Sequence, residues 1–454
     1  MPFDPRRAWE PYRPTAENPW DLRKVGHLYR RAAFGANWQE LQDGLAAGPE
    51  KTIARLLAGG EDAPPFPASI RKANAGAQIP AWWLLRLCET QNPLREKLTL
   101  FWHNHFATSN AKVNNAGFLI GMIELLHRHA LGSFRTLLLE IGRDPAMLVW
   151  LDANQSKRGM PNENYARELM ELFSLGLGHY TEQDIREAAR AFTGWEIKDG
   201  RATFNRAQHD AGEKTVLGKT GRWQADDIAN ICLEHKACPE FICGKLFRFL
   251  VSESIPATPE LLAPLAEQYR KSDFNTGELV ATIVRSEMFF SPEAYRSRVK
   301  SPVDFAVGIV RALEGRVPTS ALAAALEGLG QRLAYPPSVK GWDGGPSWLN
   351  GQTLLFRQNL ALALTSTQDN AFSRRCDPAV VLRRRRPGGD PVEFFLDLFL
   401  QGDLPAESRT RLRSYHDHAR AQPVPPYEID DLAANHPVRA LCHLILTLPE
   451  YQLD

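Results

Sequence analysis

The sequence predicts a mainly α-helical protein, with a multi-helix globular domain, a small β-hairpin and a helical C-terminal extension. Apolar residues recur at helical spacing along most of the chain, and strand-like alternation is clearest over 195–204. The composition, 44% hydrophobic and 24% charged, is that of an ordinary folded protein. A chain of 454 residues is long enough for more than one structural unit. We divide it into an arm (1–20), a main helical domain (21–366) and an extension (367–454).

Turn and cap residues place the first helices. Five prolines in the first twenty residues predict an extended arm on the surface. Asn37 and Glu40 have the spacing of a capping box, and Pro80 and Pro93 each suit the first turn of a helix. Further helices are expected over 116–131, 133–142, 162–175 and 181–195.

The second half follows the same pattern after one hairpin. Asp199-Gly200 is a two-residue turn within alternating residues, which predicts a β-hairpin. We expect the arginine run 383–386 to be a flexible, solvated surface segment. Helical periodicity is found over 226–252, 258–271, 276–288, 302–314, 319–333, 351–366, 391–401, 405–420 and 436–447.

Charge and hydropathy exclude some classes of partner. Lysine plus arginine total 54 and aspartate plus glutamate 53, so the chain lacks the basic excess of a nucleic-acid-binding protein. No run of residues is long and apolar enough for a membrane span. No apolar stretch follows Arg6-Arg7, so we expect a cytoplasmic protein, or one of the cell envelope if a leader was removed.

The first polar motif is Phe101-Trp-His-Asn-His-Phe106. His103 and His105 are two residues apart, and such positions point about 200° apart on a continuous helix. They converge on one metal ion only if the helix ends here, as Thr108-Ser-Asn110 suggests. The alternative is one capping histidine and one buried histidine bonded to the backbone.

The second motif, Asn162–Phe173, follows a polar loop that contains Asp152. Glu163 and Arg167 are four residues apart and can pair. Glu168 and Glu171 flank an apolar stripe, which suits acid–base chemistry. Ion pairing alone is an equally good explanation of this set of charges.

The third motif is His209-Asp210, with Lys214 a few residues later. A His-Asp pair occurs in metal sites of phosphohydrolases, but a turn with a capping aspartate explains it as well. The sequence lacks a Gly-x-Ser-x-Gly elbow and a His-Glu-x-x-His zinc motif, which removes two common classes of hydrolase.

The motifs together resemble a bacterial family of unknown function, DUF1800. The resemblance rests on residues 101–108, 162–176 and 188–195, continues through 336–342 and 348–350, and covers about residues 22–366. It implies a partner, because genes of this family are often next to those of DUF1501, a family that resembles the alkaline phosphatases and sulfatases. Asp343 and Pro346 depart from the usual ending of the last loop.

Two functions remain open. The first is a metal-assisted hydrolase or transferase that uses a divalent metal ion and acts with a DUF1501-type partner. Its metal ligands would be His103, His105, Asp152 and Asp210, its catalytic residues Glu168, Arg167, Glu163 and His209, and its substrate-binding residues Asn162, Asn164, Lys214 and Trp342. The second is a non-catalytic helical partner or assembly module. An enzyme requires these groups to converge in an open cleft, whereas a module requires them to be paired.

Overall fold

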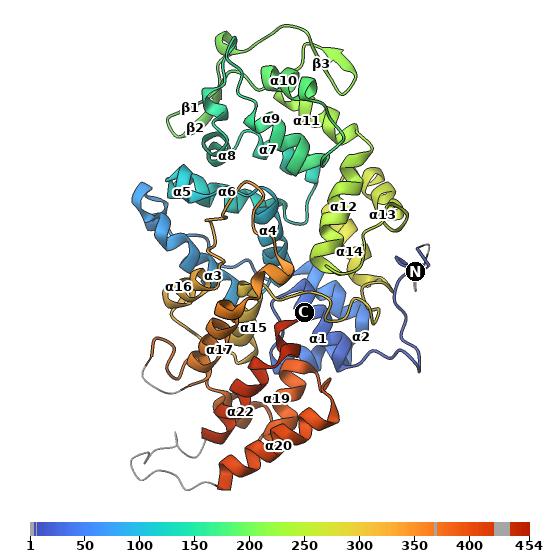
Figure 1. Ribbon diagram of the computed structural model, residues 1–454, viewed down its shortest axis with the longest axis vertical. Helices are drawn as coiled ribbons and strands as arrows, with labels where there is room; N and C mark the ends of the chain where they lie inside the picture. The colour runs from blue at the N-terminus through green and yellow to red at the C-terminus, as the bar shows by residue number, and fades with distance from the viewer. Residues whose placement is uncertain (1–3, 6, 367–369, 422–435) are drawn as a thin grey trace.

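The computed structural model describes residues 4–5, 7–366, 370–421 and 436–454, and these residues are mainly helical. The molecule is elongated (Figure 1), with α19, α20 and α22 at one end and β1, β2 and α10 at the other. Helix α4 lies between the two ends. The predicted fold class is therefore confirmed.

Most predicted helices are present. Asn37 with Glu40 and Thr181 with Asp184 form complete capping boxes. The helices of the first half are α1 (Leu22–Ala32), α2 (Trp38–Ala58, broken at Gly48), α3 (Ile79–Glu89), α4 (Pro93–His105), α5 (Asn110–Val113), α6 (Ala116–His129), α7 (Phe134–Ile141), α8 (Pro145–Trp150), α9 (Asn164–Glu168) and α10 (Glu182–Ala191).

The second half is also helical. The predicted helical stretch 226–252 is two helices, because the backbone is extended at His235. The helices are α11 (Ala225–Glu234), α12 (Ala237–Leu250), α13 (Pro259–Lys271), α14 (Thr276–Arg285), α15 (Pro302–Ala312), α16 (Thr319–Gly328), α17 (Gly351–Thr365), α18 (Pro378–Arg385), α19 (Pro391–Leu400), α20 (Ala406–Ala421) and α22 (His436–Thr447).

Two antiparallel hairpins make up the sheet structure of the described residues. The predicted one pairs β1 (Trp195–Lys198) with β2 (Arg201–Phe204), and Asp199 and Gly200 both have positive φ, as the tight turn requires. The second, not predicted as a hairpin, pairs β3 (Lys214–Val216) with β4 (Lys219–Gly221). Leu217 and Gly218 form its turn in the same conformation.

Two surface predictions need correction. The N-terminal arm is not simply laid on the surface, because Ala8, Trp9 and Tyr12 are buried and the Trp9 indole N–H donates to Leu261 O at 2.7 Å. The arginine run does not form a flexible segment, since residues 383–385 are the last turn of α18. Arg385 pairs there with Glu314 at 2.7 Å. The domain boundary at residue 366 stays a prediction.

Most side chains of α4 are buried, and the helix forms a buried ion pair with α15. Lys97 and Asp304 are both less than 10% exposed, and the Lys97 ammonium donates to the Asp304 carboxylate. Ser301 donates to the same carboxylate at 2.7 Å, and Lys97 keeps the pKa of Asp304 below its ordinary value despite its burial. No helix of the described residues has the length and apolar character that a membrane crossing requires.

We expect Lys97→Met to destabilise the protein by about 3–5 kcal/mol, because it leaves the Asp304 carboxylate buried without its cation. Urea unfolding followed by circular dichroism measures the loss. Lys271→Met is the matched control, since Lys271 pairs with Glu267 on the exposed face of α13, and its stability should be almost unchanged. Equal stability of the two variants would contradict the assignment of Lys97.

Candidate functional site

The candidate site is built around the C-terminal end of α4, where His103, Asn104 and His105 follow one another. The helix remains regular to His105, so the two imidazoles point to different sides of it, as the spacing of two residues dictates. Each of the three side chains has a different set of neighbours. The structure therefore separates the two histidines that a shared metal ion would have to join.

His105 has partners on both ring nitrogens. Its Nε2 donates to Phe173 O at 3.1 Å, and the Lys245 ammonium donates to its Nδ1 at 3.1 Å. Burial, with a further contribution from the Lys245 charge, holds the pKa of His105 well below its ordinary value. The ring is thus neutral with its proton on Nε2, and it has no lone pair left for a metal.

The partner of His105 is an unusual stretch of helix. The predicted helix 162–175 begins as α9 but continues as a π-helix, Leu169–Ser174, whose last carbonyls lack partners within the helix. His105 satisfies Phe173 O, and Lys245 satisfies Leu172 O at 3.0 Å. Burial lowers the pKa of Lys245 to about 8. His105 and Lys245 therefore act as a cap for the π-helix.

Asn104 fixes the loop that follows α16. Its side-chain amide forms two hydrogen bonds with the backbone of Trp342: it accepts from the N–H at 2.7 Å and donates to the carbonyl at 3.2 Å. Gly341 has φ +80°, and a Cβ there would lie 2.1 Å from Asn104 Oδ1. The predicted substrate-binding residue Trp342 is thus held in place by the hydrogen bonds between its backbone and the Asn104 side chain. This role of Asn104 is not predicted from the sequence, because its partner Trp342 is 238 residues away.

The His103 side chain, unlike those of Asn104 and His105, has no polar partner among the described residues. Its ring packs edge-to-face on Trp83 at 5.1 Å between centroids, and against Trp342 at 5.8 Å. Both of its nitrogens are buried and form no hydrogen bond with the described residues. Burial lowers the pKa of His103 to about 4, so the ring is neutral at physiological pH.

The charges of α9 are mostly paired. Arg167 forms the predicted ion pair with Glu163 at 3.3 Å and a bidentate pair with Glu182, both contacts at 2.8 Å. Asn162 Oδ1 accepts from the backbone N–H of Asn164 at 2.8 Å, which is an Asx turn before the helix. Three of these predicted site residues, Asn162, Glu163 and Arg167, thus have local structural partners.

Glu168 is the exception on this helix. Its half-buried carboxylate forms no hydrogen bond or ion pair with the described residues, whereas Glu171 accepts from the Tyr180 hydroxyl at 2.7 Å. Burial, and then the charge of Glu171, raise the pKa of Glu168, while Arg167 and Lys340 act in the opposite direction. Lys340 precedes the Gly341-Trp342 turn. The Glu168 carboxylate therefore interacts electrostatically with the loop that Asn104 holds.

The third motif forms a closed polar turn. Arg190 donates to Asp210 at 2.8 Å and lowers the pKa of this carboxyl to about 2. His209 Nδ1 lies 3.0 Å from Thr193 O. Lys214 is buried and donates to the carbonyls of Asp210 and Gly212 at 2.6 and 2.9 Å.

Asp152 has a left-handed backbone conformation, with φ of 56°. It pairs with Lys112 at 2.7 Å. In the part of the chain that the structure describes, no three His, Cys, Asp or Glu side chains are grouped so that they could hold a metal ion. The four predicted metal ligands, His103, His105, Asp152 and Asp210, are therefore not assembled into one centre, and three of them, His105, Asp152 and Asp210, are bonded to other residues of the protein.

We expect Asn104→Ala to loosen the loop at Trp342, because both backbone groups of Trp342 lose their partner, at a cost of about 1–3 kcal/mol. Limited digestion with trypsin measures this at the exposed Lys340, where cleavage should become faster. Asn164→Ala is the control, because the Asn164 side chain is exposed. Unchanged cleavage at Lys340 in Asn104→Ala would show that Asn104 does not hold the loop.

The acid stability of the protein should depend on His103. Its pKa of about 4 in the folded chain lies below its unfolded value of 6.5, so the unfolded chain alone takes up the proton between these pH values. The stabilisation is complete above pH 6.5 and falls by about 3 kcal/mol as the pH drops to 4. We expect His103→Phe to make the decline of the thermal midpoint between pH 6.5 and 4 shallower. His179→Phe, at an exposed site, should follow the wild type, and identical profiles for all three proteins would exclude the effect.

Comparison with known proteins bears on the whole chain rather than on one site. The family model described as "Protein of unknown function (DUF1800)" matches residues 27–453. Comparisons with curated proteins and with solved structures found no match. The match extends through the last helices as well as the motifs at 101–106 and 162–176. The chain belongs to the DUF1800 family.

Proposed function

We propose that the protein is a non-catalytic helical binding module that acts with a partner of the DUF1501 type. The observation that carries this proposal is the pairing of most of the motif side chains with other protein groups. His105 uses both ring nitrogens, Arg190 holds Asp210, and Glu182 holds Arg167. These residues build the structure around α4 and α9.

The same pairing argues against metal-assisted hydrolysis. A catalytic metal needs about three ligands with free lone pairs, and an open position for water or substrate. To ligate a metal, Asp210 would have to leave Arg190, and Asp152 would have to leave Lys112. The described residues offer no alternative group of ligands.

Helix α17 supplies a surface of the kind that a binding module needs. Leu355 and Leu362 are 54% and 47% exposed and lie seven residues apart, hence on one face of the helix. Leu354 and Phe356, on the same helix, are also exposed. Several large apolar side chains exposed on one helix are typical of a protein–protein contact. We take this α17 face as the contact for the partner.

We expect the double variant Leu355→Asp, Leu362→Asp to bind the purified DUF1501-type protein of the same organism at least about tenfold more weakly than the wild type. Isothermal titration calorimetry measures the affinity, and circular dichroism checks that both variants are folded. Leu177→Asp is the matched control, because Leu177 is 74% exposed in a different part of the chain.

Two results would overturn the proposal. If the wild type does not bind the DUF1501-type protein, the partner is wrong. If the double variant binds as tightly as Leu177→Asp, the α17 face is not the contact.

One observation favours the alternative, a hydrolase or transferase. Glu168 has an unpaired, half-buried carboxyl group with a raised pKa, as a general acid or base requires. Turnover of nitrophenyl esters of phosphate, sulfate or acetate that is lost in Glu168→Gln and kept in Glu163→Gln would support this function. Absence of turnover in the wild type would count against it.

A further inference from the structure

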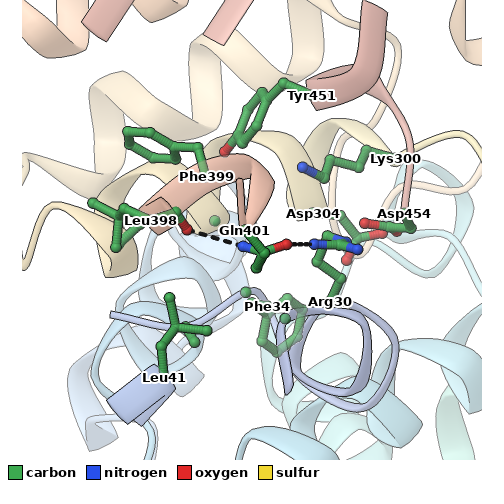
Figure 2. A pocket seen from close by; sticks show the side chains of 15 residues that line it. Arg30, Phe34, Leu41, Lys300, Asp304, Leu398, Phe399, Gln401, Tyr451 and Asp454 are labelled. Carbon is green, nitrogen blue, oxygen red and sulfur yellow. Dashed lines mark hydrogen bonds between the residues drawn. The ribbon is translucent and has the colours of Figure 1, made fainter. Parts of the chain in front are cut away.

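A small cavity lies where the N-terminal and C-terminal parts of the chain meet, far in sequence from the motifs (Figure 2). It is bordered by α1, α15, the end of α19 and residues 451–454. Its volume is about 30 Å³. A cavity of this size has room for about two water molecules or one small ion.

Two buried cations face this cavity with unused hydrogen-bond donors. Arg30 is 6% exposed and donates from Nη1 to Gln401, but its Nε and Nη2 have no partner among the described residues. Lys300 is 4% exposed, burial lowers the pKa of its ammonium to about 7, and this ammonium forms no hydrogen bond with a described residue. It lies 3.5 Å from the centroid of the Tyr451 ring. Figure 2 shows Arg30 and Lys300 on the border of the same space.

Positive charge exceeds negative charge around the cavity. The carboxylate of Asp304 is already engaged by Lys97 and Ser301. Arg298 is likewise paired with Glu253 at 3.2 Å. Asp304 also acts on Lys300 and Arg357, so this one carboxylate is shared among three cations.

The remaining charges are also unbalanced. Arg31 and Arg357 are almost fully buried close by, and Nε and Nη1 of Arg31 and Nε of Arg357 have no partner in the described chain. Asp454 is a second carboxylate, which acts on Arg31, Lys300 and Arg357, and its Oδ2 has no hydrogen-bond partner among the described residues. Glu450, the neighbouring acidic residue, acts on Arg296, and its Oε2 is buried without a hydrogen-bond partner among the described residues. Buried cations without counter-charge are costly, so the site calls for an anion.

We propose that this cavity binds one small monovalent anion of the size of chloride, held by Arg30 and Lys300. The cavity is too small for a tetrahedral oxyanion such as phosphate together with its hydrogen-bonded waters. A bound halide would accept hydrogen bonds from the free Arg30 nitrogens and from the Lys300 ammonium. It would stabilise the junction of α1 with the C-terminal residues, and this role does not depend on the function proposed above.

Bromide replaces chloride and is visible by anomalous diffraction. We expect crystals of the full chain soaked in sodium bromide to show an anomalous peak in the cavity, within hydrogen-bond distance of Arg30 and Lys300. In solution, we expect the thermal midpoint to be several degrees higher in sodium chloride than in sodium gluconate of equal ionic strength, because gluconate is too large to enter.

Variants tie the chloride effect to the cavity. Lys300→Met should lose the difference between chloride and gluconate, whereas Lys51→Met, on the exposed surface of α2, should keep it. If Lys300→Met does not fold, the bromide experiment on the wild type decides alone. Water without bromide in the cavity, or equal midpoints of the wild type in the two salts, would overturn the proposal.

Discussion

Three consecutive polar side chains at the end of α4 each bind a different part of the chain. His105 holds the carbonyl end of the π-helix together with Lys245, Asn104 holds the backbone of Trp342, and His103 fills the space between two tryptophans. Because α4 is itself buried, it positions these partners relative to one another. The motif Phe101–Phe106 is thus explained by the segments that it joins.

Local signals made much of the fold predictable. Capping boxes are closed by side chains three residues apart, and the first hairpin turn is formed by Asp199 and Gly200 alone, so short stretches of sequence contain the whole interaction. The Glu163–Arg167 pair was predictable for the same reason. The second hairpin was missed because its turn has Leu217 in a conformation that favours glycine or asparagine.

The candidate site was much less predictable, because its contacts are distant in sequence. His105 and Phe173 are 68 residues apart, and Asn104 and Trp342 are 238 apart. The sequence shows that these residues are polar and set among aromatic residues, but it does not show whether they face each other, a metal ion or a backbone carbonyl. The π-helix also has no sequence signal distinct from that of an α-helix, although the unsatisfied carbonyls that it creates are what His105 and Lys245 bind.

If the end of α4 holds its partner segments in place, these segments should unfold together with it, in one opening reaction. Native-state hydrogen exchange followed by mass spectrometry measures this directly, segment by segment, in the intact chain. We predict that residues 101–106, 169–175 and 338–343 share one opening free energy, close to that of global unfolding. Exchange of 338–343 that is orders of magnitude faster than exchange of 101–106 would contradict the central role of α4.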